Sequence, residues 1–147
     1  MYYRENFQDT LQELIVARNL TIKTLSEQSG VPLSPLYRFA KGESIPSHEN
    51  AAKLAAYFAC SFDYLFGLTD EYKAEQYTTV CSPNERFRDF LKENNYTRYQ
   101  VHKATGLEEK RLSDWFHNHR TPSLASLYTI AKNYTCSLDY LAGRSKI

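Results

Sequence analysis

Long apolar runs are missing from this sequence of 147 residues, and glycine, proline and cysteine are scarce, with five, five and three copies. A membrane-spanning helix needs roughly 18 consecutive apolar residues, and no stretch approaches that length. The N-terminus is charged at Arg4 and Glu5 and is not followed by an apolar run, which argues against a secretory signal. We therefore expect a soluble protein that neither enters a membrane nor is exported.

The few cysteines and histidines do not indicate a disulfide framework or a metal site. Cys60 and Cys136 each precede a serine and a predicted helix and are expected to be small buried residues, which leaves Cys81 alone. His117 and His119 are close in sequence, but they lack the cysteine pair or carboxylate cluster that zinc binding requires. No nucleophile elbow, phosphate-cradling loop or catalytic carboxylate pair is recognisable. We expect no metal, no cofactor and no enzymatic activity.

The charge of the chain is balanced in total but not along its length. The 18 basic and 17 acidic side chains give a net charge of +1, which on its own argues against binding to a polyanion. Residues 1–75, however, contain 7 basic and 10 acidic side chains, a net charge of −3, whereas residues 76–147 contain 11 and 7, a net charge of +4. The basic half is therefore the better candidate for contact with phosphates.

An internal repeat organises the chain. When the sequence is shifted by 76 residues, 13 of the 64 aligned pairs are identical and no gap is needed. The strongest match aligns residues 60–67, Cys-Ser-Phe-Asp-Tyr-Leu-Phe-Gly, with residues 136–143, Cys-Ser-Leu-Asp-Tyr-Leu-Ala-Gly. We therefore expect two copies of one domain, residues 1–67 and 84–147, joined by a polar linker of residues 68–83.

Each copy has the pattern of several short helices and no persistent strand pattern. Leu11, Leu14 and Ile15 have the i, i+3, i+4 spacing of one helix face, and Asn19 can adopt the left-handed conformation that ends a helix. Capping residues and turn glycines divide the rest of the first copy into four more short helices, with signals at Thr21, Gly30, Ser47, Ser61 and Gly67. The second copy repeats these signals, which predicts an all-α chain of two five-helix units.

In both copies the signals outline two helices joined by a glycine turn, with a proline after the second helix. In the first copy the outline consists of residues 21–26, Gly30-Val31, residues 38–42, Pro46-Ser47 and residues 61–67. In the second copy it consists of residues 97–101, Gly106-Leu107, residues 115–118, Pro122-Ser123 and residues 137–143. Both sets resemble the Cro/CI (XRE-type, phage-repressor-like) helix-turn-helix family. The resemblance covers about 125 of the 147 residues and implies two tandem lambda-repressor-like domains that bind double-stranded DNA.

In this family the third helix of each domain lies in the major groove, so the resemblance places base-reading side chains near its start and one turn later. By position these are Leu33, Ser34 and Arg38 in the first copy and Glu109, Lys110 and Asp114 in the second. Basic side chains can donate to guanine, whereas carboxylates can only accept, from cytosine N4, so the two copies should prefer different half-sites. The resemblance also implies phosphate contacts at Thr21, Lys41, Thr97, Arg98, Arg111, His117, Asn118, His119 and Arg120.

Two features depart from the family pattern. Ile22 stands where the family usually has a glutamine after the cap of the second helix, which weakens the first copy as an independent reader of DNA. Family members often pair an arginine on the first helix with a glutamate at the end of the third. Here apolar residues take both places, Ile15 with Ala40 and Leu91 with Phe116, which avoids the desolvation of a buried ion pair.

The resemblance implies a sequence-specific transcriptional regulator of the bacterial or phage cytoplasm, expected to be a repressor, that binds an asymmetric operator with two fused domains. A 16-residue linker can extend over about 50 Å, more than the roughly 34–36 Å between half-sites one helical turn apart. The alternative is an adaptor in which only the second copy touches DNA. In that case the first copy forms a homodimer or binds a protein partner, such as another regulator or a toxin, through an apolar patch of Ile22, Leu33 and Leu36.

Overall fold

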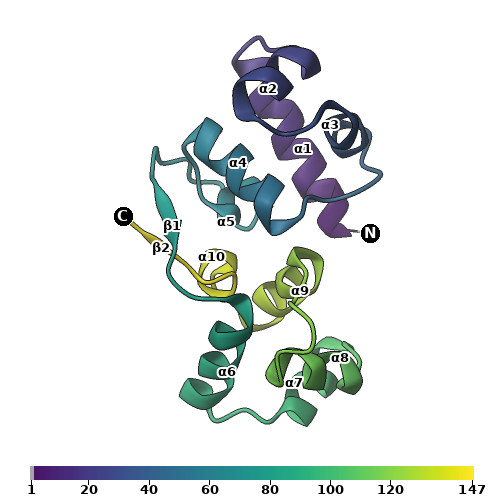
Figure 1. Ribbon diagram of the computed structural model, residues 1–147, viewed down its shortest axis with the longest axis vertical. Helices are drawn as coiled ribbons and strands as arrows, with labels where there is room; N and C mark the ends of the chain where they lie inside the picture. The colour runs from purple at the N-terminus through teal and green to yellow at the C-terminus, as the bar shows by residue number, and fades with distance from the viewer. Residues whose placement is uncertain (1) are drawn as a thin grey trace. The chain divides into compact units, whose positions relative to one another are not determined.

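The computed structural model describes residues 2–147, with side chains from Asn6 onward, and divides into unit 1, Met1–Tyr77, and unit 2, Thr78–Ile147 (Figure 1). Unit 1 contains α1 (Tyr2–Ala17), α2 (Ile22–Ser29), α3 (Leu33–Ala40), α4 (His48–Phe58) and α5 (Phe62–Leu65). Unit 2 contains α6 (Pro83–Asn94), α7 (Arg98–Thr105), α8 (Glu109–Phe116), α9 (Leu124–Tyr134) and α10 (Leu138–Leu141). The predicted fold of two five-helix units is confirmed. Within residues 2–147, no helix is both long and apolar enough to cross a membrane.

Local chemistry at the helix ends explains where most helices begin and end. The hydroxyl oxygens of Ser47 and Thr97 accept hydrogen bonds from the backbone N–H groups of Asn50, at 3.2 Å, and Gln100, at 3.1 Å. Gly30 ends α2 in the left-handed conformation, with a φ of 84°. The helices α3 and α8 differ, because no side chain caps the start of either. Their positions therefore depend more on packing than on capping.

The core of unit 1 lies between α1 and the rest of the unit. The ring of Phe7 on α1 stacks on Phe66, with 5.2 Å between ring centroids, and meets Phe39 of α3 edge-on at 5.6 Å. Leu25 of α2 and Leu36 of α3 are completely buried. Because Leu36 and Phe39 direct one stripe of α3 into the core, the opposite stripe of this helix is left for solvent.

Unit 2 repeats this arrangement with different residues. Trp115 of α8 is 2% exposed and packs edge-on against Phe87 of α6, with 5.3 Å between ring centroids. Leu112, one turn earlier on α8, is completely buried, so this helix also has one inward and one outward stripe. The two units therefore position their third helices in the same way.

A small two-stranded sheet is the one element that the sequence pattern does not predict. It pairs β1 (Tyr77–Thr79) with β2 (Arg144–Lys146). Beside it, the backbone N–H of Val80 donates a hydrogen bond to the carbonyl of Gly143 at 2.8 Å. Strands of three residues show no alternation in a sequence, and the two partners are far apart along the chain, so no local signal identifies them.

Residues 68–83, which the sequence predicts to be a linker, have ordered contacts in the structure. The hydroxyl of Tyr72 donates to the carbonyl of Phe58 at 2.6 Å, and its ring lies 5.2 Å from that of Tyr64. The other end of the segment contains β1 and the start of α6. An aromatic side chain and a strand thus attach the two ends of the predicted linker to the rest of the chain.

Candidate nucleic-acid interface

In each unit the second and third helices pack as a pair around a tight turn. Both turns are made by a glycine in the left-handed conformation, with a φ of 84° in unit 1 and 78° in unit 2. A side chain of the second helix then binds the backbone beyond the turn. Ser26 Oγ donates to the carbonyl of Val31 at 2.7 Å, and Nδ1 of His102 lies 2.6 Å from the carbonyl oxygen of Leu107. These contacts orient α3 and α8 at the point where each leaves its turn.

The outward face of α3 carries the three residues predicted to read bases in the first copy. Leu33, Ser34 and Arg38 are all exposed, Leu33 to 40%. Arg38 Nη1 donates to Ser34 Oγ at 3.2 Å, and within the described side chains no carboxylate forms an ion pair with this guanidinium. Tyr37, which the sequence prediction does not include, is 47% exposed and extends the same face. The face of α3 thus combines a cation and a hydroxyl with two large, partly apolar side chains.

The apolar patch expected on unit 1 for a protein partner is smaller than predicted. Ile22 is half-buried and Leu33 is exposed, but Leu36 is completely buried. The expectation for Leu36 is wrong because this residue shares the inward stripe of α3 with Phe39. The exposed apolar surface of α3 is therefore formed by Leu33 and Tyr37.

The two residues predicted to contact phosphate in unit 1 differ in how accessible their polar groups are. Lys41 is exposed directly after α3. The hydroxyl of Thr21 is the cap of α2, where it accepts from the backbone N–H of Thr24 at 3.0 Å and donates to the Thr24 hydroxyl at 2.9 Å. The ammonium group of Lys41 is therefore the more accessible of the two polar groups.

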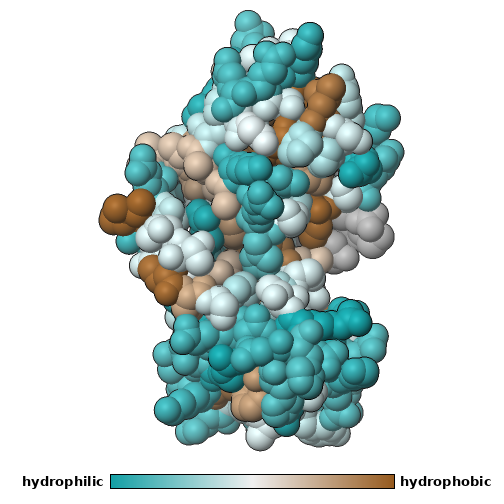
Figure 2. Space-filling view, viewed as in Figure 1, coloured by the Kyte–Doolittle hydropathy of each residue, from teal (hydrophilic) through white to brown (hydrophobic). Residues whose placement is uncertain are grey.

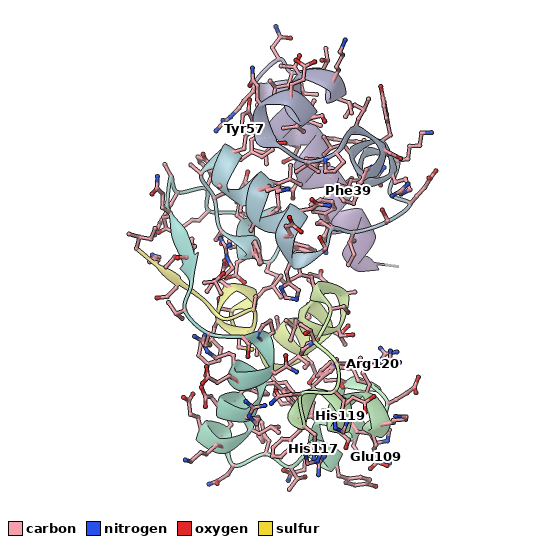
Figure 3. The ribbon with its side chains drawn as sticks, viewed as in Figure 1. Phe39, Tyr57, Glu109, His117, His119 and Arg120 are labelled. Atoms are coloured by element: carbon pink, nitrogen blue, oxygen red, sulfur yellow. The ribbon has the colours of Figure 1, made fainter. Side chains whose placement is uncertain are left out.

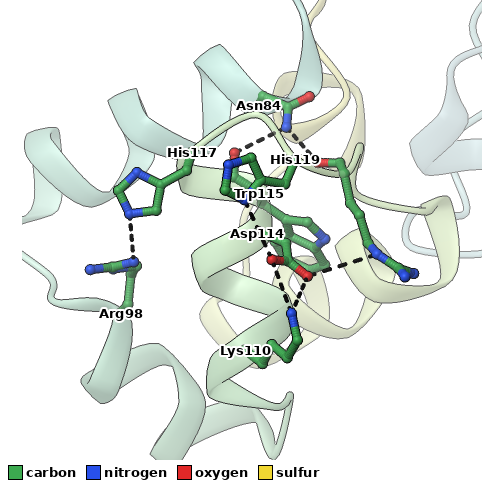
Figure 4. A network of polar contacts seen from close by, with 8 residues as sticks. Asn84, Arg98, Lys110, Asp114, Trp115, His117 and His119 are labelled. Atoms are coloured by element: carbon green, nitrogen blue, oxygen red, sulfur yellow. Dashed lines mark hydrogen bonds and ion pairs between the residues drawn. The ribbon is translucent and has the colours of Figure 1, made fainter.

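The outward face of α8 carries Glu109, Lys110 and Asp114, but the three are not equivalent. Glu109 and Lys110 are exposed on the first turn. The side chain of Asp114 is 14% exposed, and Lys110 Nζ lies 3.4 Å from its carboxylate. His119 Nδ1 and Arg120 Nε each lie 3.8 Å from the same carboxylate (Figure 4). The carboxylate of Asp114 therefore lies among basic side chains of its own unit.

The loop that follows α8 is held by side chains of α6. Asn84 Nδ2 donates to the backbone carbonyls of Trp115 at 3.0 Å and Arg120 at 2.6 Å, on either side of the loop. Arg88 Nη1 donates to Asn118 Oδ1 at 2.8 Å and to a carbonyl at the end of α8 at 3.2 Å. These four bonds hold the segment that contains four of the nine predicted phosphate-binding residues.

Unit 1 has a matching link between its first and third helices. Nε2 of Gln8 and Nε2 of Gln12 donate to the carbonyl of Ala40, at 2.9 Å and 2.8 Å. At the 76-residue offset these glutamines align with Asn84 and Arg88. The positions of the family's ion pair do not reveal this link between the first and third helices. The polar residues that recur at the 76-residue offset could have indicated it.

Arg98, at the start of α7, lies against the end of α8. Its guanidinium carbon is 4.8 Å from the ring centroid of Phe116, and its Nη1 is 3.5 Å from Nε2 of His117 (Figure 4). The preceding residue, Thr97, forms a capping box with Gln100, so its hydroxyl is engaged at the helix end. Arg98 and His117, predicted separately as phosphate contacts, are thus neighbours.

A shallow pocket of about 440 Å³ lies between α8, the loop after it and the start of α9. Arg111 borders this pocket, with its Nη2 3.8 Å from Glu108 Oε1 and its Nη1 3.5 Å from Ser126 Oγ. Three residues described above also line it: Lys110, Asp114 and Arg120. The predicted phosphate contact Arg111 therefore shares a depression with the cations of the loop.

The predicted residues of unit 2 gather on one side of that unit. Figure 3 shows Glu109, His117, His119 and Arg120 on this side, and the visible surface over α7 and α8 is hydrophilic (Figure 2). Tyr99 of α7, which the sequence prediction does not include, is 56% exposed. In the part of the chain that the structure describes, no group of three histidine, cysteine, aspartate or glutamate side chains could hold a metal ion.

Comparison with known families gives one result. The family model described as Helix-turn-helix matches the chain twice, at residues 11–65 and at residues 87–141. The two matches contain α2 and α3 in one case and α7 and α8 in the other, and together they cover more than half of the chain. The chain has no significant match among the curated proteins or among the solved structures.

Proposed function

The chain belongs to the Cro/CI-type helix-turn-helix family, and on this premise we propose that it is a sequence-specific regulator that binds double-stranded DNA with both units. The observation that carries the proposal is the arrangement of cations around α8. Lys110 lies on the exposed face of the helix, Arg98 lies against its end, and Arg120 follows it. A helix in the major groove needs cations on both sides of its exposed face, because phosphate backbones flank the groove.

In unit 2 we assign base contacts to the first turn of α8. Lys110 can donate to guanine O6 and N7, and Glu109 can accept from cytosine N4. Contacts to phosphate come from residues of α8 and of the segments next to it, namely Thr97, Arg98, Arg111, His117, Asn118, His119 and Arg120. The net charge of +4 in residues 76–147 supports this unit as the principal anchor on DNA.

In unit 1 the same face has a different chemistry. Arg38 can donate to guanine, Leu33 can contact a thymine methyl group, and Ser34 can pair with more than one base. Lys41 and Thr21 are assigned to phosphate. With Ile22 beside the cap and a net charge of −3 in residues 1–75, this unit contributes less to affinity and more to the choice of sequence.

Because the two faces differ, the operator is asymmetric, and one chain binds both half-sites without dimerising. Occupation of a promoter by such a protein excludes the polymerase, so the regulation is repression. The site of action is the cytoplasm of a bacterium or of a phage-infected cell, where the operator is located.

The second candidate is an adaptor in which unit 1 forms a homodimer or binds a protein partner and only unit 2 touches DNA. The observation that favours it is the pair of exposed residues Leu33 and Tyr37 on α3. The net negative charge of residues 1–75 also favours a protein partner over phosphate.

The test begins with selection of duplexes from a random pool by the full-length chain. Affinity and footprint on the selected duplex are then measured for Arg38→Ala and for Lys110→Ala, with Lys73→Ala as a control that removes an exposed cation outside both third helices. Each of the first two variants should lose about 1–3 kcal/mol of binding free energy and relax specificity at its own half-site. If Arg38→Ala binds like the control and the footprint covers a single half-site, the adaptor is correct.

A further inference from the structure

Asp114 contacts three side chains that are far more exposed to solvent than its own. Its side chain is 14% exposed, whereas those of Lys110, His119 and Arg120 are 83%, 70% and 78% exposed. The distances from its carboxylate to the three nitrogens are 3.4 Å, 3.8 Å and 3.8 Å (Figure 4). An acceptor for cytosine N4 must be open to the groove, and this carboxylate is already engaged with its own unit.

The equivalent position in unit 1 shows which part of the structure does not depend on the Asp114 carboxylate. Arg38 stands at the position of Asp114, and Glu43 stands at the position of His119, so the carboxylate lies on the third helix in unit 2 and on the following turn in unit 1. The backbone bond is the same in both units, from Glu43 N to the Arg38 carbonyl at 2.9 Å and from His119 N to the Asp114 carbonyl at 2.8 Å. The turn after the third helix therefore forms without an acidic side chain at the position of Asp114. What Asp114 adds in unit 2 is an anchor for the side chains of the loop.

We propose that Asp114 is a positioning residue for DNA binding: its carboxylate holds Arg120 and His119 at the end of α8, where they meet a phosphate. This role rests on the proposed function of α8 as the DNA-reading helix. A long side chain loses rotamer freedom when it binds a phosphate, and an ion pair formed beforehand reduces that loss. The guanidinium of Arg120 has five N–H donors, so it can keep one on Asp114 while it turns the others to DNA.

This role changes the sign of the expected effect of removing the carboxylate. Loss of an acidic side chain from a DNA-binding face normally strengthens binding, because repulsion of the phosphates is removed. Loss of a positioning residue weakens binding to every duplex, because phosphate contacts carry no sequence information. Loss of a base reader weakens binding only to duplexes that contain its base pair. The three roles are therefore distinguishable by sign and by sequence dependence.

The experiment compares Asp114→Asn with Glu108→Gln in the full-length chain. Each variant removes one carboxylate from the α8 region. The side chain of Glu108 is 76% exposed, so solvent screens its contact with Arg111 at 3.8 Å, and its removal tests the loss of charge without the loss of a shielded anchor. Affinity for the selected duplex and for an unrelated duplex is measured between about 50 and 200 mM salt. For Asp114→Asn we expect about three- to tenfold weaker binding to both duplexes and a log–log salt slope smaller by about 1. For Glu108→Gln we expect unchanged or tighter binding.

Asp114→Glu is the conservative variant, and it should restore most of the affinity and of the salt slope. Fluorescence of the buried Trp115 during unfolding reports whether each variant is folded, and a change in stability alone leaves the salt slope unchanged. Binding of Asp114→Asn as tight as that of Glu108→Gln overturns the positioning role, and so does a loss confined to one base pair. Failure of the unsubstituted protein to bind any duplex overturns the proposed function itself.

Discussion

Arg144 and Asp139 form a buried ion pair in unit 2, with 3.2 Å between Nε and Oδ1 and with side chains that are 8% and 3% exposed. The pair joins the start of β2 to α10. At the equivalent positions unit 1 has Leu68 and Asp63, and Asp63 is half-buried. The two copies of the repeat therefore close their C-terminal ends by different interactions.

Replacement of Arg144 by leucine, the residue of the other copy, should destabilise unit 2 by about 3–5 kcal/mol, because Asp139 stays buried without the guanidinium. Urea unfolding followed by the fluorescence of Trp115, the one tryptophan of the chain, measures this loss. The double variant Asp139→Asn/Arg144→Leu should recover most of the stability. A loss below about 1 kcal/mol in the single variant would show that the pair has no more weight than an exposed one.

Gly143 should tolerate alanine much less well than Gly106, although both have a positive φ, 81° and 78°. A Cβ at Gly143 would lie 2.1 Å from the carbonyl oxygen of Cys81, whereas a Cβ at Gly106 would have no atom within 4 Å. We expect Gly106→Ala to lose about 1–2 kcal/mol from backbone strain and Gly143→Ala to lose about 1–3 kcal/mol more from the clash. Equal losses in urea unfolding would mean that the backbone at Cys81 moves away without loss of stability.

The stability of unit 2 should fall at alkaline pH through Tyr140. Two effects raise the pKa of Tyr140 to about 12: burial, which is the larger, and the hydrogen bond to Glu93 at 2.7 Å. The tyrosine of the unfolded chain titrates near about 10, so the stabilisation is complete below that pH and is lost as the pH rises toward 12. Tyr140→Phe should therefore lose stability less steeply over this interval. Urea unfolding of both proteins at several pH values measures the difference, and parallel curves would contradict it.

Truncation to alanine should cause a large loss of stability at Leu36 and almost none at Leu33, although both belong to the apolar patch predicted from the sequence. Leu36→Ala should destabilise unit 1 by about 2–5 kcal/mol, because it leaves a cavity in the core. Leu33→Ala removes a 40%-exposed side chain and should change stability by less than about 0.5 kcal/mol. Unfolding followed by circular dichroism compares them. A large loss for Leu33→Ala would mean that this side chain is part of the core.

The helix ends were predictable because their chemistry is local. Ser47, Asn95 and Gly106 cap or end helices through bonds and backbone angles that involve only the next or preceding few residues. The repeat added a second, independent reading of the same pattern at an offset of 76 residues. These features can therefore be predicted without any knowledge of the packing.

The geometry of the candidate nucleic-acid interface is only partly predictable from the sequence. The resemblance named Arg98 and His117 separately, and packing of α7 against the end of α8 makes them neighbours. It named Asp114 as a reader of bases, because a family pattern states a position and not what surrounds it. The contacts of that carboxylate with Lys110 and the loop depend on how the segment after α8 folds back over the helix.

From the amino-acid sequence alone follow the two copies and their five helices each, since periodicity and capping are properties of neighbouring residues. The tertiary structure decides which side of α3 contains Leu36, that β1 pairs with β2, and that the carboxylate of Asp114 lies beside Arg120. The physical reason is the separation along the chain of the residues that interact. Burial, strand pairing and charge compensation join residues from separate elements, and their energies depend on distances that no local pattern contains.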